Sequence, residues 1–256
     1  MRDILHPRHR ATLARFAGTD GEAPVLLAFD YDGVLAPLVK RPGGAPMRRR
    51  TRDLLARLSR LYPVAVVSGR AWKDTRRLSE GVVPHVVGNH GFELLRPVPV
   101  PRGTLRAVAA WRRRLEADLR GVPGLHFEDK RSTLAIHYGL SAAWRRAEKA
   151  VYEAANRLEG TRLVPGKKVL NVLPHDFPNK GDAIRALLAR LGLTAALYAG
   201  DDVTDEHAFA VLRTGDVAIK VGAGPTRAGY RAGSPDELVA ALAVLADALR
   251  DGSPVP

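Results

Sequence analysis

The chain has 256 residues, 46% of them hydrophobic, so it is long enough for one large domain or two smaller ones with buried cores. It has no cysteine, which excludes disulfides and thiolate chemistry, and it has no apolar run of membrane-spanning length or signal-peptide type. We therefore expect a cytoplasmic protein, and we also expect it to be a monomer. The formal net charge of +13 predicts an attraction for anionic molecules.

Two dense clusters of basic residues stand out, "RPGGAPMRRRTR" from Arg41 and "WRRRLEADLR" from Trp111. Clustered arginine can neutralise the phosphates of a nucleic acid. It also occurs on solvated helix faces, and the second cluster is mixed with acidic residues on a predicted helix. Because no nucleic-acid-binding motif accompanies either cluster, we predict no nucleic-acid or membrane partner.

The first and last thirds of the chain alternate short apolar runs with helical periodicity, which is typical of a parallel sheet flanked by helices. Two predicted helices, Arg48–Leu61 and Lys180–Leu191, repeat leucine or isoleucine at helical spacing. In chain order, the predicted strands are Val25–Phe29, Val64–Val67, Val86–Val87, Ala196–Ala199 and Val217–Lys220.

The middle third has a different order of elements. A proline-rich connector, "RPVPVPRG" from Arg96, opens it, and "LPHDFPNKG" from Leu173 closes it. Between them the pattern helix–strand–strand occurs twice, as Leu105–Leu119, Leu125–Glu128 and Leu134–Tyr138, then as Ala142–Leu158, Arg162–Val164 and Val169–Leu173. We therefore predict an α/β core formed by residues 1–97 and 175–256, with a small α+β module, residues 98–174, inserted into it.

Polar residues cluster where the predicted strands end. Asp30 and Asp32 follow the first strand, Ser68-Gly69-Arg70 follow the second, and "GDDVTDE", residues 200–206, follows a later one. In a doubly wound sheet, ligands bind at the carboxyl ends of the strands. Each motif alone can be explained as a turn or a helix cap. Lys180 is harder to explain, because a cation at the start of a helix opposes the helix dipole unless an anion lies opposite.

Together these residues predict phosphate chemistry at a metal ion. Asp30, Asp32 and Asp201 can supply oxygen ligands to one octahedral Mg²⁺, which relieves the repulsion between the carboxylates. Lys180, with the hydroxyl and backbone N–H of Ser68, can hold the oxygens of a phosphate group. Asp30 can then attack phosphorus to give an aspartyl-phosphate, while Asp32 protonates the leaving oxygen and later activates water.

The same residues carry a family resemblance. The segments "DYDGVLAPL", "VVSGR", the lysine of "NKGDAI" and "GDDVTDEHAF" resemble the four motifs of phosphatases of the haloacid dehalogenase (HAD) superfamily. Further segments resemble one branch of it, the trehalose-6-phosphate phosphatases, in order and spacing: "VGNHGFEL", "FEDKRSTLAIHY", "GKKVLNV" and "VAIKVGAGPTRAGYR". The similarity extends from about Val25 to Arg231.

The resemblance implies a Rossmann-like HAD core, a doubly wound parallel sheet, with an inserted α+β cap domain of αββαββ order (C2B type) that closes over the sugar. It also implies a Mg²⁺-dependent phosphoric monoester hydrolase that converts trehalose 6-phosphate to trehalose and phosphate in trehalose biosynthesis. The partner of such a protein is a small sugar phosphate.

By position in the family pattern, Asp30 is the nucleophile, Asp32 the acid/base and Asp201 the third metal ligand. Ser68 and Lys180 bind phosphate, while Asp205 and Asp202 orient Lys180 and metal-bound water. The positions where the family contacts sugar are Arg70, Asn89, His90 and Gly91 on the core, and Glu128, Lys130, Lys167 and Asn171 on the cap.

Four positions depart from the family pattern. Asn171 and Leu173 stand where the family has a glutamate and a basic residue, Gly139 stands where it often has arginine, and Val34 where it often has threonine. The residues of the chemistry are intact, whereas the surface that recognises the sugar is altered. A related glycosyl or pseudo-disaccharide phosphate is therefore the alternative substrate.

Two alternatives of other classes remain at this point. A phosphoacceptor signalling module also places paired aspartates, a hydroxyl residue and a lysine around Mg²⁺, but such modules are shorter and have no cap for a sugar. A basic nucleic-acid-binding protein is the second alternative, and its retention by nucleic acid would fall steeply as salt rises.

Overall fold

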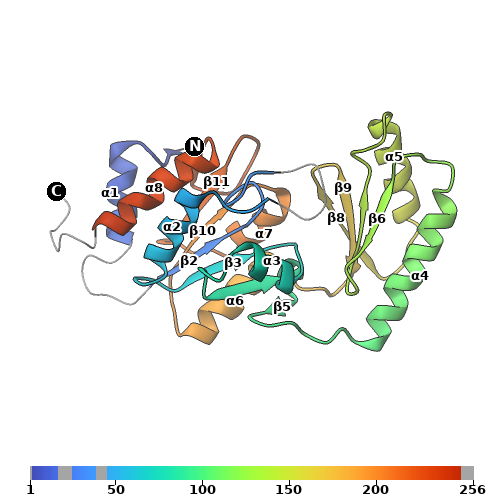
Figure 1. Ribbon diagram of the computed structural model, residues 1–256, viewed down its shortest axis with the longest axis horizontal. Helices are drawn as coiled ribbons and strands as arrows, with labels where there is room; N and C mark the ends of the chain where they lie inside the picture. Colours follow the sequence, from blue (N-terminus) through green and yellow to red (C-terminus); the bar gives the residue numbers. More distant parts are fainter. Residues whose placement is uncertain (1, 17–24, 39–44, 249–256) are drawn as a thin grey trace. The chain divides into compact units, whose positions relative to one another are not determined.

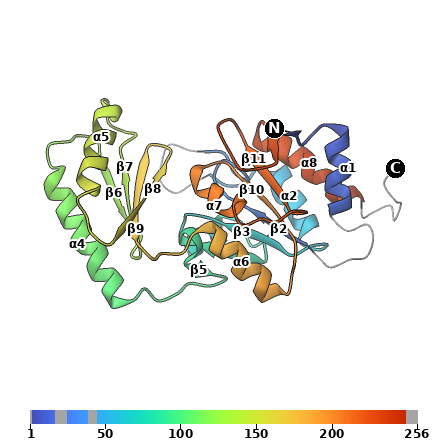
Figure 2. The ribbon, with the colours of Figure 1, turned by 180° about the vertical axis from the view of Figure 1, so that it is seen from behind.

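The computed structural model describes residues 2–16, 25–38 and 45–248, so residues 41–44 of the first basic cluster lie outside the described residues. The chain forms two compact units (Figure 1, Figure 2). The first contains the residues up to Pro97, Asn179–Asp201 and the residues from Asp205 onward, and the second contains Val98–Pro178 and Asp202–Thr204. Each unit has its own sheet and its own hydrophobic core.

The described residues of the first unit form an eight-stranded sheet in the order β1-β12-β11-β10-β2-β3-β4-β5. Neighbouring strands are parallel, except that β5 is antiparallel to β4. The strands are β1 (Arg2–Asp3), β2 (Leu26–Phe29), β3 (Val64–Val67), β4 (His85–Gly88), β5 (Glu93–Leu94), β10 (Ala196–Gly200), β11 (Val217–Val221) and β12 (Tyr230–Ala232). The strands β2 and β3 are apolar throughout, as expected for parallel strands covered on both faces.

Helices cover both faces of this sheet. One face is covered by α1 (Pro7–Phe16), α2 (Arg49–Leu58) and α8 (Pro235–Ala248), and the other by α6 (Lys180–Leu191) and α7 (Glu206–Phe209) (Figure 2). Successive side chains of a strand point to opposite faces, so β2 contributes Leu27 and Phe29 to the first core and Leu26 and Ala28 to the second. The helix α3 (Trp72–Leu78) connects β3 to β4. This arrangement confirms the predicted doubly wound α/β core.

The second unit pairs a small sheet with two helices. Its four strands are antiparallel in the order β6-β7-β9-β8. In chain order its elements are α4 (Arg102–Asp118), β6 (His126–Asp129), β7 (Leu134–His137), α5 (Trp144–Ala155), β8 (Thr161–Gly166) and β9 (Val169–Pro174). Trp111, Leu115 and Val151 of the helices pack against Leu134, Ile136, Leu170 and Val172 of the sheet. The order αββαββ is the one that the sequence predicts.

The predicted strands and helices correspond to observed elements, with ends that differ by up to three residues. The elements that are absent from the prediction are α1, α3, α7 and α8, together with the short strands β1, β5 and β12. No helix of the described part of the chain is both long and apolar enough to cross a lipid bilayer.

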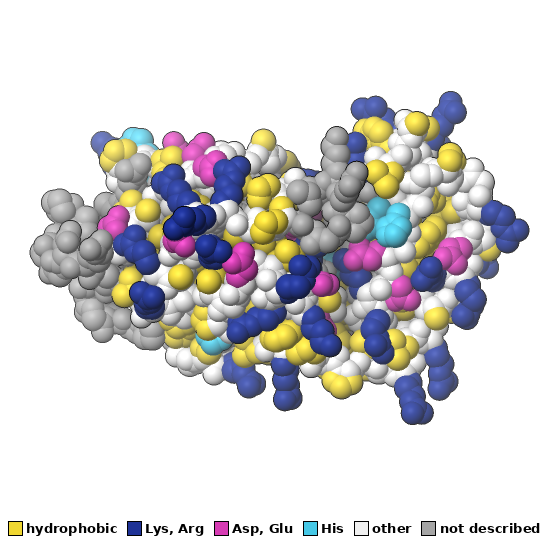
Figure 3. Space-filling model, in the orientation of Figure 1, with side chains coloured by type: hydrophobic (Ala, Val, Ile, Leu, Met, Phe, Trp, Pro, Cys, Tyr) yellow, Lys and Arg dark blue, Asp and Glu magenta, His cyan; other side chains and the backbone are white. Residues whose placement is uncertain are grey.

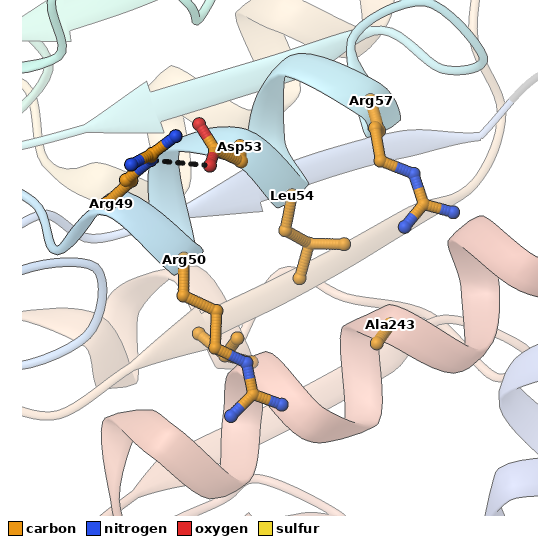
Figure 4. Close-up of a pocket in the computed structure, with 7 residues that line it drawn as sticks. Arg49, Arg50, Asp53, Leu54, Arg57 and Ala243 are labelled. Carbon is orange, nitrogen blue, oxygen red and sulfur yellow. Dashed lines mark ion pairs between the residues drawn. The ribbon is translucent and has the colours of Figure 1, made fainter.

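A groove between α2 and α8 contains residues of the first basic cluster (Figure 4). Arg50 and Arg57 lie on either side of Leu54 on α2 (Figure 4). Acidic side chains form ion pairs with several arginines of this region. Arg48, which directly precedes α2, pairs with Asp236 at 2.6 Å. Within α2, Arg57 pairs with Asp247 at 2.9 Å and Arg49 with Asp53 at 3.6 Å. Basic side chains are distributed over the face shown in Figure 3, with acidic ones between them. This favours the interpretation of solvated helix faces.

Candidate active site

The carboxyl ends of the parallel strands bring the predicted catalytic residues to one edge of the first unit's sheet. Asp30 directly follows β2, Ser68 follows β3, and Asp201 follows β10. The strands β10, β2 and β3 are neighbours in the sheet, in that order. Residues that are far apart in the sequence therefore lie at adjacent strand ends, as the doubly wound arrangement predicts.

A tight turn follows Asp30 and sets the shape of the site. The backbone N–H of Tyr31 donates to Asp30 Oδ1 at 2.7 Å, and the N–H of Gly33 donates to the carbonyl of Ala36 at 2.8 Å. Gly33 has a φ of +79°, and a Cβ at this position would collide with the carboxylate of Asp201. Only glycine suits this position, because it alone accepts the positive φ without a side chain. The turn therefore lies directly against Asp201.

Lys180 lies at the N-terminus of α6 and is 2% exposed. Its Nζ lies 2.7 Å from Asp205 Oδ1 and 3.0 Å from Asp30 Oδ1. Burial alone would lower the pKa of Lys180, but the charges of Asp205 and Asp30 and their hydrogen bonds raise it above its ordinary value. These two carboxylates are the anions that the sequence predicts opposite this lysine.

Asp205 is fully buried and accepts hydrogen bonds at both carboxylate oxygens. Its Oδ1 accepts from Tyr198 Oη at 2.6 Å and from Lys180 Nζ, while its Oδ2 accepts from the backbone N–H of Asp201 at 2.9 Å. This contact with Lys180 is the one predicted for Asp205. Tyr198 was not predicted; the signal that could have found it is a tyrosine inside the buried, otherwise apolar strand β10.

Three carboxylates come close enough to share a metal ion. Oxygens of Asp30, Asp201 and Asp205 lie within 4.8 Å of one another. Burial raises the pKa of Asp30 well above its ordinary value; the charge of Lys180 opposes this shift, and Asp205, Asp201 and Asp32 add to it. Carboxylate oxygens are the ligands that Mg²⁺ prefers, and such an ion would relieve the repulsion. The residues present therefore fit a divalent cation. Asp205 already accepts three hydrogen bonds, so Asp30 and Asp201 are the better ligands.

The Asp32 carboxylate does not join this cluster, although the sequence predicts it there. Asp32 forms a two-point ion pair with Arg70, with Nε to Oδ2 at 2.6 Å and Nη2 to Oδ1 at 2.9 Å. The physical reason is geometric, because a planar guanidinium matches both oxygens of a carboxylate. Arg70, predicted to contact the sugar, thus contacts Asp32. The role of Asp32 as acid and base stays a prediction.

Ser68 lies beside residues 89–91, the segment that follows β4 and has positive φ values. Its backbone N–H donates to the carbonyl of Val87 at 2.9 Å, so this N–H is not available to a phosphate oxygen, contrary to the prediction. The Ser68 hydroxyl accepts from the backbone N–H of Arg70 at 3.2 Å and keeps its own hydrogen to donate.

Three of the four core residues predicted to contact sugar, Asn89, His90 and Gly91, lie next to Ser68. The backbone N–H of His90 donates to the carbonyl of Ser68 at 3.0 Å. Asn89 and His90 have φ values of 46° and 58°, and Gly91 has 121°. Backbone held in this left-handed region costs of order 1–3 kcal/mol for a non-glycine residue and clusters at functional sites. The strained segment therefore supports a role for these residues in ligand binding.

The remaining predicted residues belong to the second unit. Lys130 lies in the turn between β6 and β7, and Lys167 lies in the turn between β8 and β9. Glu128 contacts His137 Nε2 at 2.8 Å. Asn171 is buried in β9 and donates from Nδ2 to the carbonyl of Val164 at 3.3 Å. Asp202 accepts from the backbone N–H of Val203 at 2.8 Å. Their predicted contacts with sugar and with metal-bound water stay predictions.

Comparison with known proteins now identifies the family, because residues 28–236 match the family model for trehalose-phosphatase. The chain belongs to the trehalose-phosphatase family. It is 35% identical over 225 residues to a trehalose-phosphate phosphatase from Mycobacterium avium (strain 104), which covers 81% of this chain. The chain spans 56% of the length of that relative. The family resemblance drawn from the sequence motifs is confirmed.

Two solved structures share the fold of this chain. The C-terminal domain of the Candida albicans trehalose-6-phosphate phosphatase superposes with a TM-score of 0.79 at 22% identity, covering 93% of this chain and 96% of that one. A sugar phosphatase of HAD subclass IIB superposes with a TM-score of 0.58 at 14% identity, covering 86% of this chain and 97% of that one. The predicted HAD fold, a Rossmann-like core with an α+β cap, is confirmed.

Proposed function

We propose that this member of the trehalose-phosphatase family is a Mg²⁺-dependent phosphatase that hydrolyses trehalose 6-phosphate to trehalose and phosphate. The observation that supports this most directly is the buried ammonium of Lys180, held between Asp30 and Asp205. A fixed cation beside a reactive carboxylate suits a phosphate group, which carries about two negative charges at neutral pH. The name of the M. avium relative supports the choice of substrate.

The reaction proceeds in two displacements at phosphorus. In the first, a carboxylate oxygen of Asp30 bonds to phosphorus, the bond from phosphorus to the sugar oxygen breaks, and Asp32 gives that oxygen a proton. In the second, Asp32 takes a proton from water, the water oxygen attacks phosphorus, and the bond to Asp30 breaks to release phosphate. Lys180 and the Ser68 hydroxyl hold the phosphate oxygens throughout.

The ion pair between Asp32 and Arg70 sets a requirement for the first displacement. Arg70 occupies both carboxylate oxygens of Asp32, whereas Asp32 must contact the leaving oxygen to act as the acid. We expect the substrate to draw Arg70 away from Asp32, which is consistent with the predicted contact of Arg70 with the sugar. The carboxylate oxygens of Asp32 would then be available to contact the leaving oxygen of the sugar.

Asp30 and Asp201 would hold Mg²⁺ at this edge, with Asp32 as the third residue predicted from the sequence. When bound, the ion neutralises charge on the phosphate and on the surrounding carboxylates. The second unit would act as the cap, presenting Glu128, Lys130, Lys167 and Asn171 to the sugar. We place the protein in the cytoplasm as a monomer without a nucleic-acid partner.

The altered cap residues favour a second candidate substrate, a trehalose-like glycosyl phosphate. The side chain of Asn171 can accept a hydrogen bond from a sugar hydroxyl but carries no charge, and that of Leu173 can make only apolar contacts. Hydrogen bonds to charged groups contribute roughly 1.5–3 kcal/mol, against about 1 kcal/mol for neutral ones. Trehalose 6-phosphate is therefore the first candidate, with recognition weaker than the usual family pattern would give.

One experiment tests both candidates. Phosphate release is measured for purified protein on a panel of sugar and disaccharide phosphates, with and without Mg²⁺. We expect Mg²⁺-dependent release, fastest on a disaccharide phosphate. No release from any sugar phosphate at saturating Mg²⁺ would refute the proposal. A higher kcat/KM on another disaccharide phosphate than on trehalose 6-phosphate would select the second candidate.

A further inference from the structure

A lysine interrupts the otherwise apolar strand β11, whose sequence is "VAIKV". The strand lies inside the sheet between β10 and β12, where a charged residue is unusual. Ile219 and Val221 pack into the core beneath α1, α2 and α8. Lys220 alternates with them and therefore points to the opposite face, the one covered by α6 and α7. The proposed reaction assigns no role to Lys220.

The register of the sheet brings Lys220 to the active-site edge. Lys220 pairs with Gly200, the last residue of β10, and Asp201 is the next residue along the chain. Lys220 is only 5% exposed, and its Nζ donates to the backbone carbonyl of Asp201 at 2.8 Å. A buried ammonium needs hydrogen-bond acceptors and a negative surrounding. The carbonyl of Asp201 supplies an acceptor, and the carboxylate of the same residue belongs to the acidic cluster.

Both backbone polar groups of Asp201 are therefore fixed by buried side chains. Asp205 Oδ2 accepts from the Asp201 N–H at 2.9 Å, and Lys220 donates to the Asp201 carbonyl at 2.8 Å. The turn at Gly33 lies against the Asp201 carboxylate. With the backbone held on both sides, the Asp201 side chain starts from a fixed position beside Asp30.

We propose that Lys220 is a positioning residue for the metal site: it holds the backbone of Asp201 so that the carboxylate of Asp201 is already in place for the cation. The inference rests on the proposed function only in assigning a divalent cation to this cluster. A ligand that is positioned before binding loses less conformational freedom when the metal binds. Removal of the Lys220 ammonium should therefore weaken metal binding, although the same change removes a positive charge that repels a cation.

These two effects have opposite signs, so direct metal binding decides between them. Mn²⁺, which can stand in for Mg²⁺ at oxygen ligands, is titrated into the protein while free Mn²⁺ is followed by electron paramagnetic resonance. The variants are Lys220→Met, which keeps most of the side-chain volume, and Lys220→Arg, which keeps a cation and hydrogen-bond donors. Lys149→Met, which changes an exposed lysine of α5, is the matched control.

We expect Lys220→Met to bind Mn²⁺ about five- to fiftyfold more weakly than the wild type, the range expected when part of a charged hydrogen bond is lost. Lys220→Arg should recover at least half of this loss on a logarithmic scale, and Lys149→Met should match the wild type. In activity assays, the Mg²⁺ concentration for half-maximal rate should rise in Lys220→Met, while KM for the sugar phosphate at saturating Mg²⁺ stays within about twofold.

Two results would overturn the inference. Unchanged or tighter Mn²⁺ binding by folded Lys220→Met would show that Lys220 acts by charge alone or has no role at this site. An equal loss in Lys220→Arg and Lys220→Met would indicate a packing defect.

If circular dichroism shows that Lys220→Met is unfolded, Lys220→Gln replaces it and is judged by the same outcomes, because its shorter neutral side chain does not reach the Asp201 carbonyl. Since Mn²⁺ binding needs no substrate, a wild type that binds Mn²⁺ but hydrolyses no sugar phosphate would refute the proposed function alone.

Discussion

At the scale of single residues, Asp205 determines the geometry of the site although it is not among the predicted reacting groups. It orients Lys180, accepts from Tyr198 Oη, and holds the backbone of Asp201. Burial raises the pKa of Tyr198 well above its ordinary value, and the charges of Asp205 and Asp30 add to the shift. Tyr198 therefore remains a hydrogen-bond donor to Asp205 at any pH in which the protein works.

Replacement of Asp30, the proposed nucleophile, should abolish turnover without unfolding the protein. In Asp30→Asn the amide has nearly the shape of the carboxyl group but cannot form the acyl-phosphate. Lys180 keeps Asp205 as its partner, so we expect the circular dichroism spectrum to match that of the wild type. Phosphate release is the measurement, and activity within about tenfold of the wild type, or roughly 1.4 kcal/mol of barrier, would contradict the role of Asp30.

Replacement of Asp32, the proposed general acid, should affect substrates according to their leaving groups. A sugar alkoxide needs a proton to leave, whereas an aryl oxide leaves with little help. We therefore expect Asp32→Asn to lose more activity on sugar phosphates than on p-nitrophenyl phosphate, measured as kcat on both. Asp32→Asn also keeps one carbonyl oxygen for Arg70. Equal losses on the two substrates would assign Asp32 a structural or metal-binding role instead.

At the scale of elements, the start of α6 positions Lys180 through a capping box. Asn179 Oδ1 accepts from the backbone N–H groups of Gly181 and Asp182, and Asp182 Oδ2 accepts from the N–H of Asn179 at 3.0 Å. These bonds satisfy orphan N–H groups of the first turn. They also place an acidic residue near the helix N-terminus, which partly offsets the unfavourable charge of Lys180 there.

Loss of this cap should destabilise the first unit. We expect Asn179→Ala to lower the free energy of unfolding by about 1 kcal/mol, the usual effect of removing an N-cap side chain. Urea denaturation followed by circular dichroism measures the change. Asn179→Ser keeps a capping oxygen and is the control, so a loss in Asn179→Ser as large as that in Asn179→Ala would mean that the cap is not the cause.

At the scale of the whole molecule, the candidate sugar-binding residues are divided between the two units. The first unit carries the predicted catalytic residues Asp30, Ser68, Lys180 and Asp201 together with the candidate sugar-binding residues at 70 and 89–91. The second unit carries the remaining candidate sugar-binding residues on its small antiparallel sheet and in the turns of that sheet. Residues of the second unit can then change, as at Asn171 and Leu173, which are both buried in β9, while the predicted catalytic residues of the first unit are retained. Fold and function are distinct in this respect, because specificity depends on side chains added to a common framework.

Metal removal should abolish activity and lower stability together. The carboxylates at the sheet edge repel one another without a cation, so we expect EDTA to stop phosphate release and Mg²⁺ to restore it better than Ca²⁺, whose bonds are longer. At a Mg²⁺ concentration about 100 times Kd, binding should stabilise the fold by about 2.7 kcal/mol, which calorimetry can detect. Activity that survives exhaustive chelation would contradict the metal site.

The net charge of +13 should not make this protein a specific nucleic-acid binder. Several arginines of α2 are paired with acidic residues, so we expect no retention on a DNA or RNA column at physiological salt. Weak retention at low salt that disappears by about 0.15 M salt is the expected non-specific attraction. Sequence-dependent retention at physiological salt would support the nucleic-acid alternative.

The sequence by itself predicted the central strands, two helices in each unit, and most of the residues that meet at the sheet edge. Apolar runs and helical repeats are local properties, and the rule that ligands bind at the carboxyl ends of parallel strands turned Asp30, Ser68, Lys180 and Asp201 into one predicted site. It also predicted the αββαββ insertion. It missed α8, because a helix that is apolar over most of its surface lacks the amphipathic repeat that marks α2.

Only the tertiary structure decided which charged groups pair within the site. Asp32 and Arg70 are 38 residues apart, and Lys220 and Asp201 are 19 apart, so no local pattern specifies these contacts. They depend on strand register and on the burial of charge, because a buried ionic group is unfavourable unless it is paired or hydrogen-bonded. The sequence therefore specified the chemistry of the edge, whereas the packing of the sheet assigned Asp32 to Arg70 and brought Tyr198 and Lys220 to Asp205 and Asp201.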